Sequence, residues 1–597
     1  MIIQSRKYTL VDFVKIPLNI SPLWTILIII NRIINALWPS VQVLVTAKFI
    51  DTATGIFNKT VAYDQIFLPL FLIMGIIAYQ YLTWSVMSIV NLKLQIRLTE
   101  SFKNAIVEKR SKLQYRYIEN NDTWDLINRA CGDPVGRVSS GLDQILGAAD
   151  LIIRVVSVLL IVMTQVWWAG LVMIAISVPL FYISVKAGKT NYDANKEAQK
   201  HSRKAGYLSG VLSSRDYVEE RALFGYTDEI NNRWFDKYET ARKIELKVRL
   251  KNFIRMKSSS IMTVFISLSI IAVLIPAVGL GNITIGMFMG LVTATLNLVQ
   301  MMSWQLSWIA SELANSKEYL KDLSEFSALL EESYATDMPQ DMSGMEFESI
   351  EFQHVSFQYP ETDRYILRDC SFKLTANLHY AFVGVNGAGK TTITKLLTGM
   401  YDNFEGDILI NHKSIREYTL PQLKGIFSVV YQDFAKYYIP FKDNIQLGNV
   451  LVQDDDRVDR AINTIDLQET VDKLPDGKTT WLGKIKENGT DLSGGEWQRV
   501  AIARSLYSDA LVSILDEPTA ALDPMAESKI YEMFGKISEG KSTIFITHRL
   551  GAAKLADEIF VIDEGHLAES GSHKELIEKG GIYAKMFESQ KGWYANE

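Results

Sequence analysis

The sequence contains very little cysteine. Among 597 residues, only Cys131 and Cys370 carry a thiol. Two thiols are too few for a disulfide framework or a thiolate metal site, so both kinds of structure are excluded. Both thiols are therefore expected to be free.

The chain also lacks an excess of positive charge. Its formal net charge is -6 and its pI is about 5.8, so there is no global basic footprint and no nucleic-acid partner is expected. Hydrophobic residues make up 48% of the chain, but this average conceals two different halves. Residues 20–310 hold long apolar runs, whereas residues 346–597 have the pattern of a soluble α/β domain.

Six stretches in the first half are long and apolar enough to span a lipid bilayer. They are 23–47, 66–90, 145–164, 169–185, 260–279 and 285–306. The first stretch is too long for the core of a signal peptide and lacks a small-residue cleavage site, so we expect it to be retained. The sequence therefore predicts an all-α domain with six membrane-spanning helices.

The connections between these stretches differ in their basic residues. Residues 93–137 hold nine Lys and Arg and residues 186–257 hold seventeen, whereas residues 49–64 hold one. The positive-inside bias therefore places both long connections and both termini in the cytoplasm. The long connections are helix-like, which predicts that the spans continue past the bilayer as cytoplasmic helical extensions. Residues 115–125 and 213–220 interrupt this pattern.

Several polar residues and glycines fall inside the predicted spans. Arg32 lies near the middle of the first, where a charge should face a polar cavity or a partner rather than lipid. A structural hydrogen bond between helices is the alternative for Arg32. Asp150 and Arg154 are four residues apart and can pair on one face of a helix. Gly286 and Gly290 allow another helix to approach closely.

The second half contains a glycine-rich loop directly after a predicted buried strand, 380–383. Its sequence is Gly384-Val385-Asn386-Gly387-Ala388-Gly389-Lys390-Thr391-Thr392. The glycines let backbone N–H groups and the N-terminus of the following helix converge on the β- and γ-phosphates of a nucleotide. Lys390 neutralises phosphate charge, and the Thr391 hydroxyl is placed to ligate Mg²⁺. This strand–loop–helix context is the one that the motif requires.

A second group of motifs lies further along the chain. It consists of Leu492-Ser493-Gly494-Gly495-Glu496-Trp497-Gln498-Arg499, Ile514-Leu515-Asp516-Glu517-Pro518-Thr519 and Ala521-Leu522-Asp523. Asp516 closes an apolar strand and is the expected carboxylate of the metal site. Glu517 follows it, where it can polarise an attacking water molecule as a general base. In this order and spacing, the glycine-rich loop and these motifs resemble the nucleotide-binding domain of ABC (ATP-binding cassette) proteins.

The resemblance implies ATP and Mg²⁺ as cofactors and assigns roles to three more residues. Tyr359 matches the aromatic residue that stacks on adenine. Gln432 matches the glutamine that contacts the metal ion and the attacking water. His548 matches the switch histidine that contacts the γ-phosphate.

The resemblance also implies a dimer. In this family the residues that match Ser493, Gly494 and Gly495 cap the γ-phosphate that is bound to the other ATPase domain, and Asp523 lies in the loop that links the two ATP sites. The chain has one such domain, so it is expected to work as a half-transporter with a second copy or a related chain. Glu496 departs from the family pattern by replacing the commoner glutamine, and the segment 483–489 is longer than usual.

Nearly the whole chain resembles an exporter-type ABC protein with fused domains. The expected fold class is a multidomain membrane protein in which an all-α six-helix domain precedes an α/β P-loop domain. We expect the transmembrane domain in residues 1–310, a helical extension and linker in 311–345, and the nucleotide-binding domain in 346–597. The two interruptions at 115–125 and 213–220 resemble coupling helices; solvated corners are the alternative.

The resemblance implies an ATP hydrolase that drives export across a bacterial plasma membrane, with its ATPase domain in the cytoplasm. The segment Tyr431-Gln432-Asp433-Phe434 and residues 520–527 are similar to exporters of lantibiotics and other ribosomal peptides. No cysteine precedes the first span, so an attached leader peptidase is not expected. A multidrug or lipid flippase is one alternative, and a non-transport sensor or peptide-immunity module is the other.

Overall fold

The chain divides into two compact units. The computed structural model describes residues 3–165, 201–281, 283–518 and 541–594, with scattered residues between 166 and 200. The first unit comprises Met1–Arg110 and Asp122–Leu329, and the second comprises Ser111–Asn121 and Leu330–Glu597. The short segment Ser111–Asn121 therefore groups with the C-terminal part of the chain.

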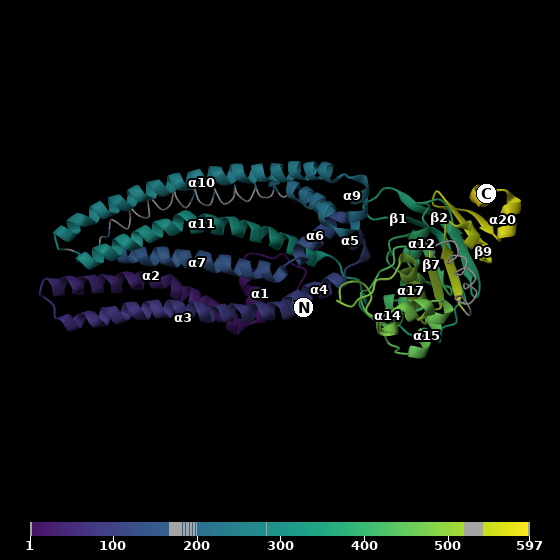
Figure 1. Ribbon diagram of the computed structural model, residues 1–597, viewed down its shortest axis with the longest axis horizontal. Coiled ribbons are helices and arrows are strands. Elements are labelled where there is room, and N and C mark those ends of the chain that lie inside the picture. Colours follow the sequence, from purple (N-terminus) through teal and green to yellow (C-terminus); the bar gives the residue numbers. More distant parts are fainter. Residues whose placement is uncertain are drawn as a thin grey trace. The chain divides into compact units, whose positions relative to one another are not determined.

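Helices of very different length make up the described part of the first unit. They are α1 (Asp12–Ile20), α2 (Pro22–Phe57), α3 (Phe67–Leu98), α4 (Asn104–Ser111), α6 (Asn121–Cys131), α7 (Pro134–Gln165), α9 (Val218–Phe224), α10 (Thr227–Gly279) and α11 (Ile285–Ala328). Helices α2, α3, α7 and α11 pack together, and α10 runs beside α11 (Figure 1). A π-turn, Thr99–Lys103, joins α3 to α4, so the span continues into a helical extension as predicted.

Three helical stretches of the described residues are long and apolar enough to cross a membrane. They are Pro22–Phe57, Tyr63–Ser111 and Pro134–Thr164, and they contain the first three predicted spans. Less than a third of each apolar window is buried, which suits a surface in contact with lipid. The fourth predicted span, 169–185, lies almost entirely outside the described residues. The fifth and sixth lie within α10 and α11.

Two glycines set the contact between α2 and α11. A Cβ on Gly286 would lie 2.0 Å from the carbonyl oxygen of Ala47, and a Cβ on Gly290 would lie 3.1 Å from that of Val43. The Gly286 N–H donates a hydrogen bond to Asp51 at 2.7 Å. These glycines therefore allow the close helix approach that the sequence predicted.

The N-terminal helix α1 was missed by the sequence analysis. Phe13 of this helix is fully buried and stacks on Tyr319 of α11. The Asp12 carboxylate accepts hydrogen bonds from Arg6 at 2.6 Å and from the Thr9 N–H at 2.7 Å. Its nine residues are too few for a span, so a search for long apolar runs does not find it.

The second unit combines two β-sheets with short helices. Its strands are β1 (Ser349–Gln358), β2 (Tyr365–Thr375), β3 (His379–Val383), β4 (Glu405–Ile410), β5 (Lys413–Ser414), β6 (Phe427–Val430), β7 (Val512–Asp516), β8 (Ser542–Ile546), β9 (Glu558–Asp563) and β10 (His566–Gly571). Its helices are α5 (Tyr115–Glu119), α12 (Lys390–Leu397), α13 (Leu420–Ile426), α14 (Phe441–Gln446), α15 (Asp455–Thr464), α16 (Gln468–Lys473), α17 (Gly494–Leu506), α19 (Leu550–Ala553), α20 (His573–Lys579) and α21 (Ile582–Tyr594).

The larger sheet brings the predicted motifs to one edge. Its strand order is β10-β9-β3-β8-β7-β6, and the strands from β9 to β6 are parallel. Strands β7 and β8 are buried along their whole length, as expected for a parallel sheet covered on both faces. The carboxyl ends of parallel strands lie at the same edge, so the loops after β3, β6, β7 and β8 meet there.

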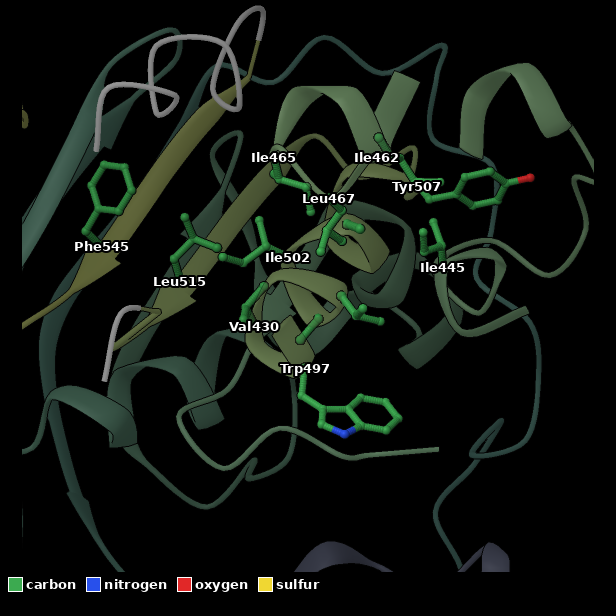
Figure 2. Close-up of a cluster of buried hydrophobic side chains, with 14 of the residues drawn as sticks. Val430, Ile445, Ile462, Ile465, Leu467, Trp497, Ile502, Tyr507, Leu515 and Phe545 are labelled. Carbon is green, nitrogen blue, oxygen red and sulfur yellow. The ribbon is translucent and has the colours of Figure 1, made fainter. Parts of the chain in front are cut away.

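A buried cluster ties the signature helix to this edge. Figure 2 shows Trp497 and Ile502 of α17 with Val430, Leu515 and Phe545, which lie near the carboxyl ends of β6, β7 and β8. Trp497 is 1% exposed. Burial of such side chains contributes roughly 1.5–3 kcal/mol each, so the position of α17 against the strand ends is strongly specified.

Candidate nucleotide-binding site

The loop between β3 and α12 needs its glycines. Gly384 has φ 154°, Gly387 has φ 80° and Gly389 has φ 108°, which L side chains rarely adopt. A Cβ on Gly384 would lie 2.2 Å from the carbonyl oxygen of Ile562, and a Cβ on Gly389 would lie 2.7 Å from Leu367 Cδ2. Gly387 has open space around it. The loop is therefore pressed against its own sheets on one side and open at Gly387.

Lys390 occupies the inside of this loop. Its ammonium group donates hydrogen bonds to the carbonyl oxygens of Gly384 at 2.8 Å and Val385 at 3.2 Å. Burial lowers the pKa of Lys390, while Glu517 and Asp516 oppose this effect. A buried cation within a ring of backbone groups matches the requirement for holding phosphate oxygens.

Thr391 and Asp516 form the candidate metal site. The Thr391 hydroxyl donates to the Asp516 carboxylate, whose other oxygen, Oδ1, is buried and has no hydrogen-bond partner within the described part of the chain. Burial raises the pKa of Asp516 to about 6, with a further contribution from Glu517. An unsatisfied buried carboxylate oxygen beside a hydroxyl fits a hard divalent cation such as Mg²⁺.

Glu517 lies next to the metal carboxylate in an unfavourable backbone conformation. Its φ is 50°, and its N–H donates to the carbonyl oxygen of Ile546 at 2.8 Å. Its Oε1 lies 2.7 Å from Nδ1 of His548, while Oε2 is buried without a hydrogen-bond partner in the described residues. The structure thus brings the two predicted catalytic residues together and leaves one carboxylate oxygen for a water molecule.

The loop that carries His548 is held from the C-terminal helix. The Gln590 amide of α21 donates to the carbonyl oxygen of His548 and accepts from the Leu550 N–H at 2.9 Å. The Thr547 N–H donates to Phe382 at the end of β3. The backbone around His548 is therefore held by contacts from two other elements.

Tyr359 lies directly after β1 and close to α12. Its hydroxyl hydrogen bonds with that of Thr392 at 3.0 Å. The Lys395 ammonium lies 5.0 Å from the centre of the Tyr359 ring, a distance at which a cation–π attraction operates. The aromatic residue that is predicted to stack on adenine therefore contacts α12, the helix that follows the phosphate loop.

Ser493 begins the signature helix α17 with a capping box. Its hydroxyl accepts from the Glu496 N–H at 3.3 Å and donates to Glu496 Oε2 at 2.7 Å. Glu496 also accepts from the Ser493 N–H at 2.8 Å and from the Thr470 hydroxyl at 3.1 Å. The carboxylate that replaces the common glutamine therefore organises the start of this helix, where Gly494 and Gly495 form the first turn.

Two predicted residues are not joined to this cluster. Gln432 follows β6, is exposed, and makes no hydrogen bond to the other site residues in the part of the chain that the structure describes. Asp523 lies outside the described residues. In the phosphate loop, Val385 is 56% exposed, Ala388 is buried and Asn386 is exposed.

Comparison with known families agrees with this geometry. Residues 367–520 match the ABC transporter family, and residues 22–306 match the ABC transporter transmembrane region. The chain belongs to the ABC transporters. It carries fused transmembrane and ATP-binding domains, and this architecture implies transport coupled to ATP hydrolysis.

Relatives with different described substrates resemble this ABC transporter. The subtilin transport ATP-binding protein SpaT of Bacillus subtilis is 28% identical over 94% of this chain and 90% of its own length. The ATP-dependent lipid A-core flippase of Pseudomonas aeruginosa is 28% identical over 83% of this chain and 80% of its own length. A structure described as a bacterial Atm1-family ABC exporter with ATP bound has a TM-score of 0.73 and 23% identity, and covers 94% of this chain and 98% of its own. The fold is thus that of an exporter.

Three residues near the site were missed by the sequence analysis. They are Lys395, Gln498 and Gln590; the Gln498 amide donates to the Glu517 carbonyl oxygen at 3.4 Å. Lys395 lies one turn and a half after Lys390 on α12, a spacing that could have drawn attention to it. Gln498 lies within the signature motif but was given no role of its own there, and no signal in the sequence points to Gln590.

Proposed function

We propose that the protein is an ATP-driven exporter whose working form is a dimer with two ATP sites. The observation that carries the proposal is the cluster of Glu517, His548, Asp516 and Thr391 at the carboxyl ends of β7, β8 and β3. Lys390 and the glycine-rich loop hold the phosphates of ATP, and Tyr359 holds the adenine. Thr391, Asp516 and Gln432 would hold Mg²⁺, which would neutralise negative charge on the phosphates.

Glu517 is the general base in the proposed reaction. Its Oε2 accepts a proton from the attacking water, and His548 keeps the carboxylate oriented through Oε1. Ser493, Gly494 and Gly495 of one chain cap the γ-phosphate held by the other, and Asp523 joins the two sites. ATP binding closes the two ATPase domains, and the coupling segments 115–125 and 213–220 transmit the closure to the spans, which then open outward.

We further propose that the transported substrate is a ribosomal peptide of the lantibiotic type. Similarity to the subtilin transporter along nearly the whole chain supports this proposal. A lipid flippase is the second candidate, because the lipid A-core flippases also match. The expected location is a bacterial plasma membrane with the ATPase domain and both termini in the cytoplasm.

The test of the ATPase assignment is the Glu517→Gln substitution in the full chain in lipid nanodiscs. Hydrolysis should fall at least about a hundredfold, the range that general bases contribute, while ATP binding stays within about twofold. The matched control is Glu578→Gln, an exposed position on α20. Hydrolysis that persists in Glu517→Gln, or that is lost equally in the control, would contradict the assignment.

A further inference from the structure

A half-open cavity of about 900 Å³ lies between four helices of the helical unit. One face of each of four helices lines it. On α2 these residues run from Ile28 to Thr46, and on α3 they run from Gln80 to Asn91 at steps of three and four. At 1.5 Å per residue the face on α2 extends for roughly 27 Å, so the cavity is elongated. Its size is near the upper end of ordinary ligand pockets.

Side-chain amides are the commonest polar groups in the lining of this cavity. They are Asn31, Asn35, Gln42, Gln80, Asn91 and Asn297. Asn35 donates to Asn31 at 3.1 Å, but the other four make no side-chain hydrogen bond within the described residues. Polar groups at membrane depth are costly unless they meet a partner or water, so a row of unpaired amides indicates a surface that binds a polar ligand.

The charged groups of the cavity are already paired. Arg32 contacts Asp143 at 2.9 Å, and Nε of Arg154 contacts Asp150 at 2.9 Å. The lining holds two arginines and one aspartate, and Asp143 beside it supplies the second negative charge, so these four groups together carry no net charge. A ligand with several phosphates would need unpaired cations, and a strongly cationic one would need unpaired carboxylates. Neither is offered by the described residues that line the cavity.

Hydrogen-bonding geometry favours a peptide backbone among uncharged ligands. Each amide presents one acceptor and two donors, which matches the alternating C=O and N–H groups of a peptide. The contact of Arg154 with Asp150 uses only Nε, so within the described residues its two terminal nitrogens stay open to carbonyl oxygens. Trp38 and Trp84 add apolar surface for side chains. An extended chain advances about 3.3 Å per residue, so roughly eight residues fit along α2.

We infer that this cavity binds an uncharged stretch of an extended peptide through its backbone amides, with Gln42, Gln80, Asn91 and Asn297 as the main partners. The inference rests on the proposed export function and specifies its substrate. Arg32 and Arg154 act there as neutralised donors rather than as sites for a phosphorylated headgroup.

Photocross-linking to the full chain in phosphatidylcholine nanodiscs, without nucleotide, tests the inference. The probe is a blocked, uncharged octapeptide of serine, leucine and one photoreactive leucine. Saturable cross-links should map to the cavity faces of α2 and α3. An unlabelled copy of the peptide should compete at least about tenfold better than a disaccharide lipid with two phosphates. Better competition by the lipid, or cross-links confined to other surfaces, would overturn the inference.

One double variant and one control test whether the amides make the binding contacts. Replacing both Gln80 and Asn91 by leucine removes two hydrogen bonds and should weaken binding about tenfold. Gln95→Leu is the control, because Gln95 lies on the same helix, is exposed and does not line the cavity. Equal affinity in the double variant would contradict the role of the amides.

A variant that changes the charge of the lining is expected to gain binding, and a folding defect cannot produce such a gain. Gln80→Glu preserves shape and adds an unpaired carboxylate, so a lysine-containing version of the peptide should bind better to it than to the natural chain. An unchanged preference would overturn the charge argument. ATP hydrolysis on the same discs separates the two proposals: hydrolysis without peptide cross-links contradicts only the cavity inference, and cross-links without hydrolysis contradict only the proposed export function.

Discussion

Glu517 is held in a backbone conformation that a glutamate rarely adopts. A non-glycine residue at positive φ costs on the order of 1–3 kcal/mol and persists where surrounding contacts enforce it. Here the enforcing contacts are the Glu517 N–H to Ile546 and the Gln498 amide to the Glu517 carbonyl oxygen. This backbone conformation directs the carboxylate toward His548 and away from the direction in which β7 runs.

Glu496 is the residue at which this chain departs from its family. The carboxylate accepts a hydrogen bond from the Ser493 hydroxyl. Burial acts to raise the pKa of Glu496, but hydrogen bonds from Ser493 and Thr470 together with the charge of Arg499 lower it. The ionised group therefore competes with a phosphate for the Ser493 hydroxyl and adds negative charge beside it.

The Glu496→Gln variant should bind ATP more tightly in the closed dimer. Glutamine can keep the helix cap through its carbonyl oxygen, so only the charge is lost. We expect the apparent KM for ATP to fall by about two- to fivefold, the range of an interaction worth up to about 1 kcal/mol. ATPase kinetics measure this, with Glu487→Gln in the preceding exposed segment as the control. A KM that rises would contradict the competition.

At the scale of elements, α5 is joined to the helix of the phosphate loop. Glu119 of α5 forms an ion pair with Lys395 of α12 at 2.6 Å and accepts a hydrogen bond from the Tyr401 hydroxyl. The Lys395 ammonium also lies 5.5 Å from the ring of Tyr115 and 5.0 Å from that of Tyr359. Lys395 therefore contacts both α5, which belongs to a predicted coupling helix, and Tyr359, which is predicted to hold adenine.

A pair of variants tests this link. Lys395→Met and Glu119→Gln should each lower the stimulation of ATP hydrolysis by the transported peptide, by about fivefold for a charged hydrogen bond of moderate burial. The double variant should be no worse than the more severe single one, because both remove the same contact. Lys373→Met, an exposed position on β2, is the control. Additive losses would show that the two residues act separately.

At the scale of the whole molecule, the chain has one phosphate loop and one signature. If each ATP site combines the loop of one chain with the signature of another, neither Lys390→Met nor Ser493→Arg homodimers can hydrolyse ATP. A dimer that pairs the two variants regains one intact site. Equal co-expression should therefore restore about a quarter of the natural activity when pairing is random. Activity of either variant alone, or no recovery on mixing, would contradict the shared site.

Local signals in the sequence were sufficient to locate the spans and the nucleotide-binding loops. Apolar runs locate α2, α3 and α7, because a helix must bury its backbone polar groups within itself to cross lipid. The glycine-rich loop after β3 and the acidic pair Asp516–Glu517 after β7 were found because strand ends and turns leave patterns within a few residues. Parallel pairing then accounts for their meeting at one edge.

What the sequence by itself determined is therefore the order of the spans, the nucleotide-binding domain and the residues of its loops. The tertiary structure alone decided the pairing of Arg32 with Asp143, of Lys395 with Glu119, and of Gln590 with the His548 loop. The first two pairs join residues 111 and 276 positions apart. Contacts at such separations depend on how helices and strands pack, and they leave no periodicity along the chain from which they could be predicted.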